Sequence, residues 1–290
     1  MLCALCPRAC NKERGEHEGA GLCRMGTNPR LARAALHFGE EPPISTGGSG
    51  AVFFSGCTLK CVYCQNYKIS HENFGKEVSI EALKNIYQSL ISQGARNINL
   101  VSGTQFVPQI IESLTPAPGV PVIWNSSGYE KIETLRLLKG HIDVYLPDLK
   151  YMDGDLAFRL SAARDYPEVA CAAIEEMLNQ TGRVRINKKG NITRGTIVRH
   201  LVLPGQIQNT KMVLKYFKEN LFGAYLSLMA QYTPMGAACD YPDINRPITQ
   251  EEYASAVEYM ESLNITNGFV QELSSAKSEY TPEFDLTGIF

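Results

Sequence analysis

Residues 51–64 read AVFFSGCTLKCVYC and join a short apolar run to three closely spaced cysteines. The run at residues 51–54 is rich in strand-forming side chains and has glycines on both sides, a pattern typical of a short buried strand. Cys57, Cys61 and Cys64 follow it with the spacing C-x3-C-x2-C. We therefore expect a buried strand whose carboxyl end leads directly into a loop that carries three thiols.

Alternating helices and strands follow this loop. Apolar residues recur at helical spacing over residues 80–91, and Gly94 is placed to end that helix. Further strands are predicted at residues 98–101, 120–124, 142–146, 196–203 and 224–229, with helices near residues 107–114, 131–138 and 210–220. The last helix should begin at Thr249, which can form a capping box with Glu252. This alternation predicts an α/β fold with a parallel sheet, and such sheets bind ligands at the carboxyl ends of their strands.

The composition excludes several classes of partner. The chain has 290 residues with 28 Lys and Arg against 30 Asp and Glu, a net charge of −2, and it has no run of basic residues. It therefore has no general electrostatic attraction to nucleic acid or to an anionic membrane surface. No stretch approaches the roughly 18 consecutive apolar residues of a membrane span, and the first residues, MLCALCPR, do not resemble a secretory signal. We expect a cytoplasmic protein that binds neither nucleic acid nor membrane.

Seven of the nine cysteines fall in two groups. Cytoplasmic thiols are kept reduced, so both groups favour metal ligation or redox chemistry over disulfides. The first group, with the spacing C-x2-C-x3-C-x12-C, consists of Cys3, Cys6, Cys10 and Cys23. Its four thiolates could hold a structural zinc ion or an auxiliary iron–sulfur cluster, or they could remain partly unliganded. Cys171 and Cys239 stand alone and are expected to be ordinary buried thiols.

The second group supplies three thiolates, whereas a [4Fe-4S] cluster takes four, one for each iron. With Cys57, Cys61 and Cys64 as its only protein ligands, one iron stays open, and the amino and carboxylate groups of S-adenosylmethionine could chelate it. An electron passed to the sulfonium would then cleave a C–S bond and release a 5′-deoxyadenosyl radical. Three alternatives remain: a zinc site completed by His71, a closed cluster with a fourth cysteine from elsewhere, and unligated thiols. The preceding strand and the following strand–helix repeats favour the first interpretation.

Three longer strings extend this interpretation to a family. They are residues 54–57 (FSGC), residues 61–66 (CVYCQN), with the aromatic Tyr63 before the last cysteine, and residues 37–45 (HFGEEPPIS). Over nearly the whole chain the sequence resembles the radical SAM superfamily, and more narrowly its pyruvate formate-lyase activating enzyme-like branch. The resemblance implies a partial (β/α)6 TIM-like barrel with an N-terminal Cys-rich extension. We expect the extension at residues 1–47, the barrel at residues 48–273 and a C-terminal tail at residues 274–290.

The resemblance also implies which residues hold the cofactor. Ser102, Gly103 and Thr104 stand where the superfamily has a Gly-rich turn that ends in a glutamate and binds the methionine amino group. No acidic residue stands there in this chain, so backbone carbonyls and small side chains would accept those hydrogen bonds instead. After the third strand, Asn125 places a short hydrogen-bonding side chain at the level expected for the ribose.

Charged residues stand after the fourth predicted strand and in residues 199–205 (RHLVLPG), the run that closes the fifth. Asp148 and Lys150 are similar to the Asp-x-Lys motif of glycyl-radical activating enzymes, which lies near the carboxylate of the cofactor and takes part in a small cation site. Alternate residues of a strand project to the same face, so both side chains would approach one pocket. Arg199 suits bidentate contacts with a carboxylate or phosphate, which makes it a further candidate for binding cofactor or substrate.

These features predict a radical SAM oxidoreductase that contains a [4Fe-4S] cluster and cleaves S-adenosylmethionine reductively. The resulting radical would abstract a hydrogen atom from a second substrate. For an activase that substrate is a glycyl-radical enzyme, and the alternative is another peptide or a metabolite. Either reaction needs an electron donor such as flavodoxin or ferredoxin. A rival hypothesis from a different class is an iron–sulfur or zinc protein without turnover of its own.

Overall fold

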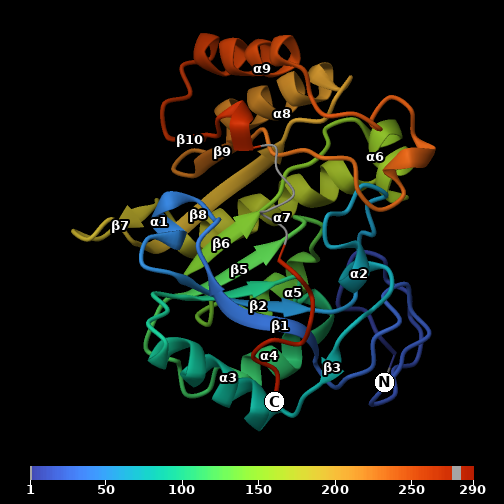
Figure 1. The fold of residues 1–290 in the computed structure, drawn as a ribbon, viewed down its shortest axis with the longest axis vertical. Coiled ribbons are helices and arrows are strands. Elements are labelled where there is room, and N and C mark those ends of the chain that lie inside the picture. The colour runs from blue at the N-terminus through green and yellow to red at the C-terminus, as the bar shows by residue number, and fades with distance from the viewer. Residues whose placement is uncertain (1, 276–281) are drawn as a thin grey trace.

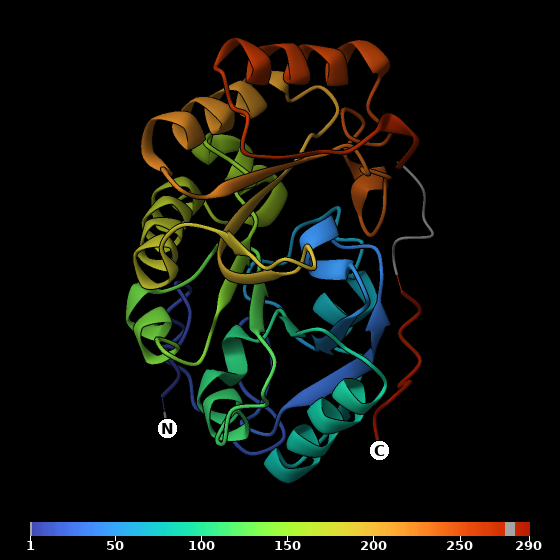
Figure 2. The ribbon, with the colours of Figure 1, turned by 90° about the vertical axis from the view of Figure 1, so that its left-hand side faces the viewer.

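The fold is a curved sheet with most of its helices along the outer side (Figures 1 and 2). The computed structural model describes residues 2–275 and 282–290. Within these residues one sheet has the strand order β10-β9-β8-β6-β5-β4-β2-β1-β3, and β7 pairs with β8 outside this order. Every neighbouring pair from β2 to β10 is parallel, as the strand–helix alternation predicted. The expected α/β architecture of a partial barrel is confirmed.

The secondary structure elements have the following bounds. The strands are β1 (Arg30–His37), β2 (Ser49–Phe54), β3 (Lys76–Glu77), β4 (Ile98–Val101), β5 (Val122–Ser126), β6 (Val144–Pro147), β7 (Arg185–Ile186), β8 (Ile192–Leu201), β9 (Tyr225–Met229) and β10 (Gly268–Val270). The helices are α1 (Pro42–Ser45), α2 (Tyr67–Ser70), α3 (Ile80–Ser92), α4 (Val107–Ser113), α5 (Ile132–Leu137), α6 (Gly154–Ser161), α7 (Tyr166–Thr181), α8 (Ile207–Asn220) and α9 (Gln250–Ser262). None of the helices in the described parts of the chain is long and apolar enough to cross a bilayer.

Alternation along the central strands decides which side chains face the inside of the curve. Side chains two positions apart share one face of a sheet. On the inner face of three neighbouring strands, an apolar residue is followed two positions later by a polar one. The pairs are Ile123 and Asn125, Leu146 and Asp148, and Ile197 and Arg199. The apolar members lie in one buried cluster, so the polar members form a separate layer nearer the carboxyl ends of the strands.

A short segment between β1 and β2 closes the interior from the amino-terminal end of the strands. Helix α1 carries Ile44, which is fully buried against the apolar inner-face residues of β5, β6 and β8. The side chain of Asn97 donates a 2.9 Å hydrogen bond to the carbonyl of Ile44 and accepts one of 2.6 Å from the hydroxyl of Ser49. This segment therefore brings Glu40, just before α1, up against the polar layer.

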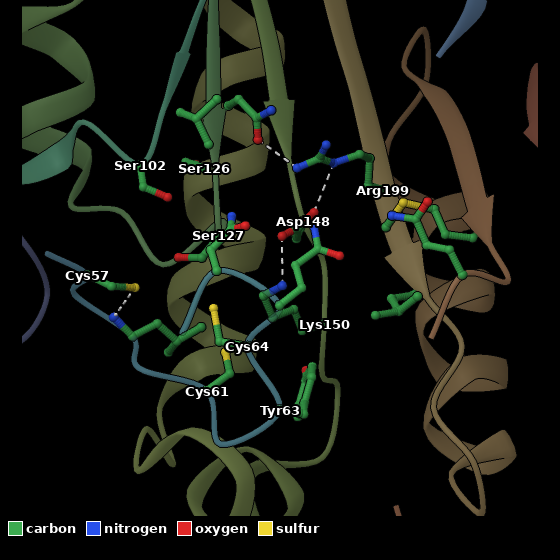
Figure 3. A pocket seen from close by; sticks show the side chains of 18 of the residues that line it. Cys57, Cys61, Tyr63, Cys64, Ser102, Ser126, Ser127, Asp148, Lys150 and Arg199 are labelled. Carbon is green, nitrogen blue, oxygen red and sulfur yellow. Dashed lines mark hydrogen bonds and ion pairs between the residues drawn. The ribbon is translucent and has the colours of Figure 1, made fainter. Parts of the chain in front are cut away.

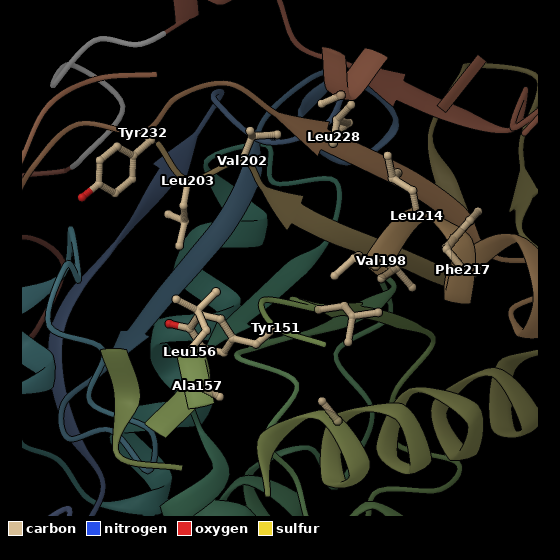
Figure 4. Close-up of a cluster of buried hydrophobic side chains, with 14 of the residues drawn as sticks. Tyr151, Leu156, Ala157, Val198, Val202, Leu203, Leu214, Phe217, Leu228 and Tyr232 are labelled. Atoms are coloured by element: carbon tan, nitrogen blue, oxygen red, sulfur yellow. The ribbon is translucent and has the colours of Figure 1, made fainter. Parts of the chain in front are cut away.

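Two apolar cores lie between the sheet and its outer helices. One packs α3, α4 and α5 against β2, β4 and β5 and contains the fully buried Trp124. The other joins helices α6 to α9 to β8 and β9, where Val198, Leu214, Phe217 and Leu228 meet (Figure 4). Full burial of a side chain of this size stabilises the fold by about 1.5–3 kcal/mol. The strand ends that carry the polar layer are thus held from behind by packed apolar side chains.

Details at the helix ends agree with the sequence analysis. The hydroxyl of Thr249 accepts a hydrogen bond from the backbone amide of Glu252, and the carboxylate of Glu252 accepts one from the amide of Thr249. The predicted capping box is confirmed. Gly94 follows α3 with a φ of 103°, a conformation that glycine adopts readily.

Several of the described elements were not predicted, namely the helices α1, α2, α6 and α7 and the strands β1, β3, β7 and β10. Helices α6 and α7 fill residues that had no assignment, and β1 lies within the expected Cys-rich extension. The sequence of β1, RLARAALH, is rich in residues that prefer helices. Antiparallel pairing with β2 overrides this preference. The boundary at residue 47 stays a prediction, and one strand of the main sheet lies on its amino-terminal side.

The expected C-terminal tail is described only in part, because residues 276–281 lie outside the described residues. After them the chain runs along β1, where the amide of Ala34 donates to the carbonyl of Thr287 and the amide of Leu286 donates to the carbonyl of Ala32. Phe284 is buried, with its ring 5.5 Å from that of Phe53 in an edge-on contact. The end of the chain thus packs on the edge of the barrel.

Candidate functional site

A cavity lies at the carboxyl ends of the central strands (Figure 3). Its walls come from the ends of β2, β4, β5, β6, β8 and β9, and its floor includes Glu40. This is the edge at which the strand–helix alternation predicted ligand binding. The cavity brings together eight of the predicted residues, namely Cys57, Cys61, Cys64, Ser102, Asn125, Asp148, Lys150 and Arg199. Two others, Gly103 and Thr104, do not line it.

The three cysteines lie on the loop that follows β2, as predicted. The backbone amides of Leu59 and Lys60 donate to the sulfur of Cys57 at 3.3 and 3.4 Å. Cys61 is buried, and burial raises its pKa. Burial also raises the pKa of Cys64 to about 12. As free thiols Cys61 and Cys64 are protonated at neutral pH, so a positively charged metal centre would be needed to hold them as thiolates.

Tyrosine side chains pack against one another beneath the cysteine loop and hold it in place. The hydroxyl of Tyr63 lies 2.7 Å from that of Tyr151, which in turn lies 2.9 Å from the hydroxyl of Ser161. Tyr63 also contacts Tyr232 edge-on, with 5.8 Å between the ring centroids. The amide of Val62 donates to the carbonyl of Leu160 at 2.9 Å, at the end of α6. The loop is therefore fixed by contacts with α6, with the segment before α6 and with the segment after β9, and its cysteines keep their direction toward the cavity.

Opposite the cysteines, Arg199 sits at the centre of a charged network (Figure 3). Its guanidinium donates to the carboxylate of Asp148 at 3.0 Å, to the side-chain oxygen of Asn125 at 2.6 Å and to the carboxylate of Glu40 at 3.2 Å. Lys150 donates to the second oxygen of Asp148 at 2.7 Å. Four predicted residues from three strand ends are thus joined in one network, and it holds two cations against two carboxylates.

Mutual attraction keeps this network charged. Burial favours the neutral form of Asp148, but the charges of Lys150 and Arg199 outweigh it, so the pKa of the carboxyl is lowered. Burial likewise favours neutral Lys150, and attraction to Asp148 outweighs it, so the pKa of the ammonium is raised. The pKa of Arg199 is also raised, because Asp148 and Glu40 overcome the effect of burial. Both cations therefore stay charged beside the cavity.

Glu40 is a site residue that the sequence analysis did not single out. One of its carboxylate oxygens accepts hydrogen bonds from the side chains of Asn99 at 3.0 Å and Asn125 at 3.3 Å, and the other accepts from Arg199. Its side chain is only 12% exposed. Glu40 belongs to the string HFGEEPPIS, which carried part of the family resemblance. No local sequence pattern indicated that its carboxylate contacts Arg199 of β8.

The three residues of the turn after β4 do not all face the cavity. Ser102 lines the cavity with a φ of 59°. Gly103 packs so closely on Trp124 and Ile110 that a Cβ there would lie 2.6 Å from a carbon of Ile110. Thr104 is buried and donates a 2.7 Å hydrogen bond to Glu130. The turn thus directs Gly103 and Thr104 into the packed core and leaves only Ser102 at the cavity, while binding of the cofactor by these three residues stays a prediction.

A sequence profile described as the radical SAM superfamily matches residues 51–215, which contain the cysteine loop and the strands of the charged network. This chain belongs to the radical SAM superfamily. A relative in Methanocaldococcus jannaschii, the uncharacterized protein MJ0674, is 31% identical over 273 residues, which are 91% of this chain and 75% of that protein.

Solved structures show the same radical SAM fold. Streptococcus suis SuiB bound to the precursor peptide SuiA is similar with a TM-score of 0.53 and 12% identity, over 77% of this chain and 49% of SuiB. A second structure of SuiB gives a TM-score of 0.52 with 13% identity and the same coverage. This chain spans about half the length of SuiB.

Radical SAM enzymes catalyse radical reactions with a [4Fe-4S] cluster and S-adenosylmethionine, and membership implies both for this chain. The donor set fits the cluster, because three cysteine sulfurs face one cavity and two backbone amides point at one of them. For zinc, the alternative ligand His71 instead stacks on Tyr67, with 4.1 Å between ring centroids, and pairs with the hydroxyl of Ser70. Among the described residues, no three His, Cys, Asp or Glu are gathered for a single ion.

The remaining cysteines of the radical SAM chain lie outside the cavity. Those of the amino-terminal group, Cys3, Cys6, Cys10 and Cys23, are all half-buried. Cys171 is half-buried, 3.7 Å from the sulfur of Met152, whereas Cys239 is exposed. The expectation that both isolated thiols are buried is thus wrong for Cys239, which lies in a short surface turn at residues 238–240.

Proposed function

We propose that this chain cleaves S-adenosylmethionine reductively and uses the 5′-deoxyadenosyl radical to abstract a hydrogen atom from a second substrate. In this proposal Cys57, Cys61 and Cys64 hold the [4Fe-4S] cluster. One observation carries this proposal. A single cavity has three cysteine sulfurs on one side and the charged network of Asp148 and Arg199 on the other. S-adenosylmethionine carries a carboxylate, an amino group and a sulfonium, so it needs a cluster site and charged side chains within one pocket.

The residues of the chain would divide the binding of the cofactor among them. Lys150 and Arg199 remain charged beside the cavity and suit its carboxylate, while Asp148 holds both cations in position. The side chain of Asn125 suits the ribose hydroxyls, and the backbone and hydroxyl of Ser102 suit the amino group. When bound, the cluster supplies the electron that cleaves the C–S bond of the cofactor.

For the second substrate we propose a peptide or protein segment that presents a backbone Cα–H bond, with a glycyl-radical enzyme as the leading candidate. The strings at residues 37–45 and 61–66 support the activase branch, as does the pair Asp148 and Lys150. SuiB, which has a similar fold, is bound to its precursor peptide SuiA in one of the solved structures, and this favours a peptide over a metabolite. An electron donor of the flavodoxin or ferredoxin class would supply the reducing equivalent.

The experiment is anaerobic reconstitution of the full chain with iron and sulfide, followed by dithionite and S-adenosylmethionine. Chromatography of the products should show 5′-deoxyadenosine. A Cys57→Ala, Cys61→Ala, Cys64→Ala chain should give none, whereas a Cys171→Ala, Cys239→Ala chain, which removes thiols outside the cavity, should give the wild-type amount.

Equal product from the wild-type chain and the triple variant would overturn the proposal in favour of an iron–sulfur or zinc protein without turnover. The peptide assignment has its own measurement, which uses a glycine-containing peptide deuterated at Cα. Deuterium found in 5′-deoxyadenosine by mass spectrometry would support abstraction from a backbone glycine. Deuterium-free product formed in the presence of candidate glycyl-radical enzymes and peptides would contradict it.

A further inference from the structure

The barrel is open along one side, and the end of the chain lies at this opening. Within the described residues the strand order places β10 at one edge of the sheet and β1 with β3 at the other, and these edges do not pair with each other. Strand β3 pairs with β1 at Arg30 and Leu31. Residues 282–290, which we call the C-terminal segment, run beside the following residues of β1 (Figures 1 and 2). The C-terminal segment therefore borders the open side of the barrel.

Backbone and side-chain contacts hold the C-terminal segment to β1. The amide of Ala34 donates a 2.9 Å hydrogen bond to the carbonyl of Thr287. The guanidinium of Arg33 donates to the carbonyl of Glu283 and to the carboxylate of Asp285, both at 2.9 Å. Three alternate residues of the segment are thus fixed to two neighbouring residues of β1.

Phe284, between these contacts, points toward the interior of the barrel. Its side chain is only 6% exposed and belongs to a small apolar cluster, whose other buried members are Ala32, Ala51, Phe53, Ile69 and Val101. Two members of the cluster, Phe53 and Val101, also line the cavity that contains the three cysteines. Phe284 therefore packs directly against residues of the cavity wall and supports them from the open side.

The C-terminal segment also contacts the helix that follows the cysteine loop. The ammonium of Lys68, in α2, donates a 2.6 Å hydrogen bond to the carbonyl of Phe284. Ile69 of the same helix packs in the Phe284 cluster, and its carbonyl accepts a 2.8 Å hydrogen bond from the amide of Gly56, directly before Cys57. The segment thus joins the edge strand β1 to the helix beside the cysteine loop.

Pro282, at the start of the C-terminal segment, is itself a cavity residue. It lines the cavity together with Gln65 and Asn66, which connect the last cysteine of the loop to α2. Pro282 lies two residues before the buried ring of Phe284, so its place in the cavity wall depends on how that ring is seated.

A simpler role for the C-terminal segment is to cover an edge strand, because uncovered edges pair with other chains. That role requires the hydrogen bonds to β1. It requires neither the contact with Lys68 of α2 nor a residue of the segment in the cavity wall. These additional contacts indicate that the segment also serves the site.

We propose that the C-terminal segment is a side wall of the cavity that keeps small molecules from the 5′-deoxyadenosyl radical, with Phe284 as the residue that positions it. The inference rests on the proposed function, since it concerns the radical formed there. A primary carbon radical abstracts hydrogen from most C–H bonds that it meets, and closure of an active site prevents such side reactions. With the side closed, hydrogen transfer is confined to a substrate that enters at the carboxyl ends of the strands.

The first test is the seating of the segment, which needs no radical. The amide of Ala34 donates to the segment, so hydrogen–deuterium exchange of peptides from β1 reports whether the segment is in place. We expect Phe284→Ala to speed this exchange about thirtyfold, the factor that corresponds to about 2 kcal/mol of apolar burial. Phe284→Leu, which keeps a large apolar side chain, should stay close to the wild-type rate.

Phe290→Ala is the matched control, because it makes the same change at a ring that is 61% exposed. Its exchange should equal that of the wild type. If Phe284→Ala also exchanges at the wild-type rate, Phe284 does not seat the segment and the proposal is overturned.

The second test is access to the radical. Reconstituted chains receive dithionite and S-adenosylmethionine in buffer that contains perdeuterated glycerol and no second substrate. When the radical reacts with glycerol, one C–D bond of glycerol breaks and one forms at the 5′ carbon, and dithionite and water then supply the electron and proton that restore glycerol. We expect little deuterium in 5′-deoxyadenosine from the wild type and several-fold more from Phe284→Ala.

The deuterium fraction separates a wall from a merely structural role. A variant that has only lost stability would form less 5′-deoxyadenosine with an unchanged deuterium fraction. Phe284→Leu should restore the low fraction, and Phe290→Ala should not change it. Equal fractions from the wild type and Phe284→Ala overturn the wall, whereas absence of 5′-deoxyadenosine from the wild type would instead contradict the proposed function.

Discussion

The hydroxyl of Thr104 donates a 2.7 Å hydrogen bond to a carboxylate oxygen of Glu130, across the ends of β4 and β5. The indole of Trp124 lies 3.4 Å from the same oxygen, and the other oxygen has no partner among the described residues. Glu130 is buried, and no opposite charge is among the causes of its pKa shift. The turn at residues 102–104 contains no acidic residue of its own. The carboxylate of Glu130 lies behind this turn and anchors it from the core.

Replacement of Glu130 should change how stability depends on pH. Burial raises the pKa of Glu130 from 4.5 to about 7. Between these values the folded chain holds a proton that the unfolded chain has released, so the free energy of unfolding falls as the pH rises through this window. Glu130→Gln removes this dependence. Between pH 5 and pH 8, we expect the variant to gain about 2 kcal/mol relative to the wild type.

Urea denaturation at both pH values measures this gain. Glu133→Gln, an exposed substitution on the same loop-to-helix segment, should show no such gain and serves as the control. If the difference between Glu130→Gln and the wild type is the same at pH 5 and pH 8, Glu130 titrates as an ordinary carboxylate, and its buried, uncharged state is ruled out.

Loss of Arg199 should be costly because two carboxylates depend on it. Arg199→Met leaves Glu40 without a cationic partner and Asp148 with Lys150 alone. Breaking a buried ion pair by removal of one partner costs about 3 kcal/mol. Chemical denaturation should show this loss, and in a Glu40→Gln background the same substitution should cost less. Arg185→Met, on the exposed strand β7, should leave stability unchanged. An equal loss in both backgrounds would mean that Glu40 and Arg199 are not coupled.

Much of this network could be predicted from local sequence. Asn125, Asp148 and Arg199 lie toward the carboxyl ends of β5, β6 and β8 or just after them, and such ends meet at one edge of a parallel sheet. The cysteine spacing indicated the cluster loop directly. The polar strand ends follow from the two-residue period of a strand, and the cluster loop follows from the spacing of three cysteines. Both can be read from a single sequence.

The remaining parts depend on contacts between distant segments. Glu40 reaches the cavity only because Ile44 packs between β5, β6 and β8. No local sequence pattern predicts that Ile44 fills this space. Glu130 is one polar residue in a loop, and its burial depends on Trp124 and Thr104. Strand β1 has a composition that favours helix, and its strand conformation comes from pairing with β2.

Removal of the charge at Lys150 should weaken binding of the cofactor. Its ammonium is held 2.7 Å from Asp148 beside the cavity, with a side-chain exposure of 16%. A hydrogen bond to a charged group contributes about 1.5 kcal/mol, so Lys150→Met should raise the Kd for S-adenosylmethionine about tenfold. Equilibrium dialysis with the labelled cofactor measures this change. The exposed substitution Lys139→Met should have no effect, and unchanged affinity in Lys150→Met would remove Lys150 from the set of cofactor ligands.

Gly56 should couple the amino-terminal segment to the cysteine loop. It has a φ of 82°, and a Cβ added there would lie 2.5 Å from the side chain of Met25. Gly56→Ala therefore combines backbone strain with a steric clash directly before Cys57. Gly94 has a φ of 103° and nothing within 4 Å of its added Cβ, so Gly94→Ala isolates the strain, which costs about 1–2 kcal/mol.

We expect Gly56→Ala to lower the free energy of unfolding more than Gly94→Ala does, because the clash adds to the strain. It should also reduce the iron bound per chain after reconstitution, since relief of the clash displaces Cys57 from its amide donors. Shortening of the opposing side chain in a Gly56→Ala, Met25→Ala chain should restore the iron content but not the stability lost to strain. If Gly56→Ala and Gly94→Ala bind the same iron as the wild type, contact with Met25 does not control the position of the loop.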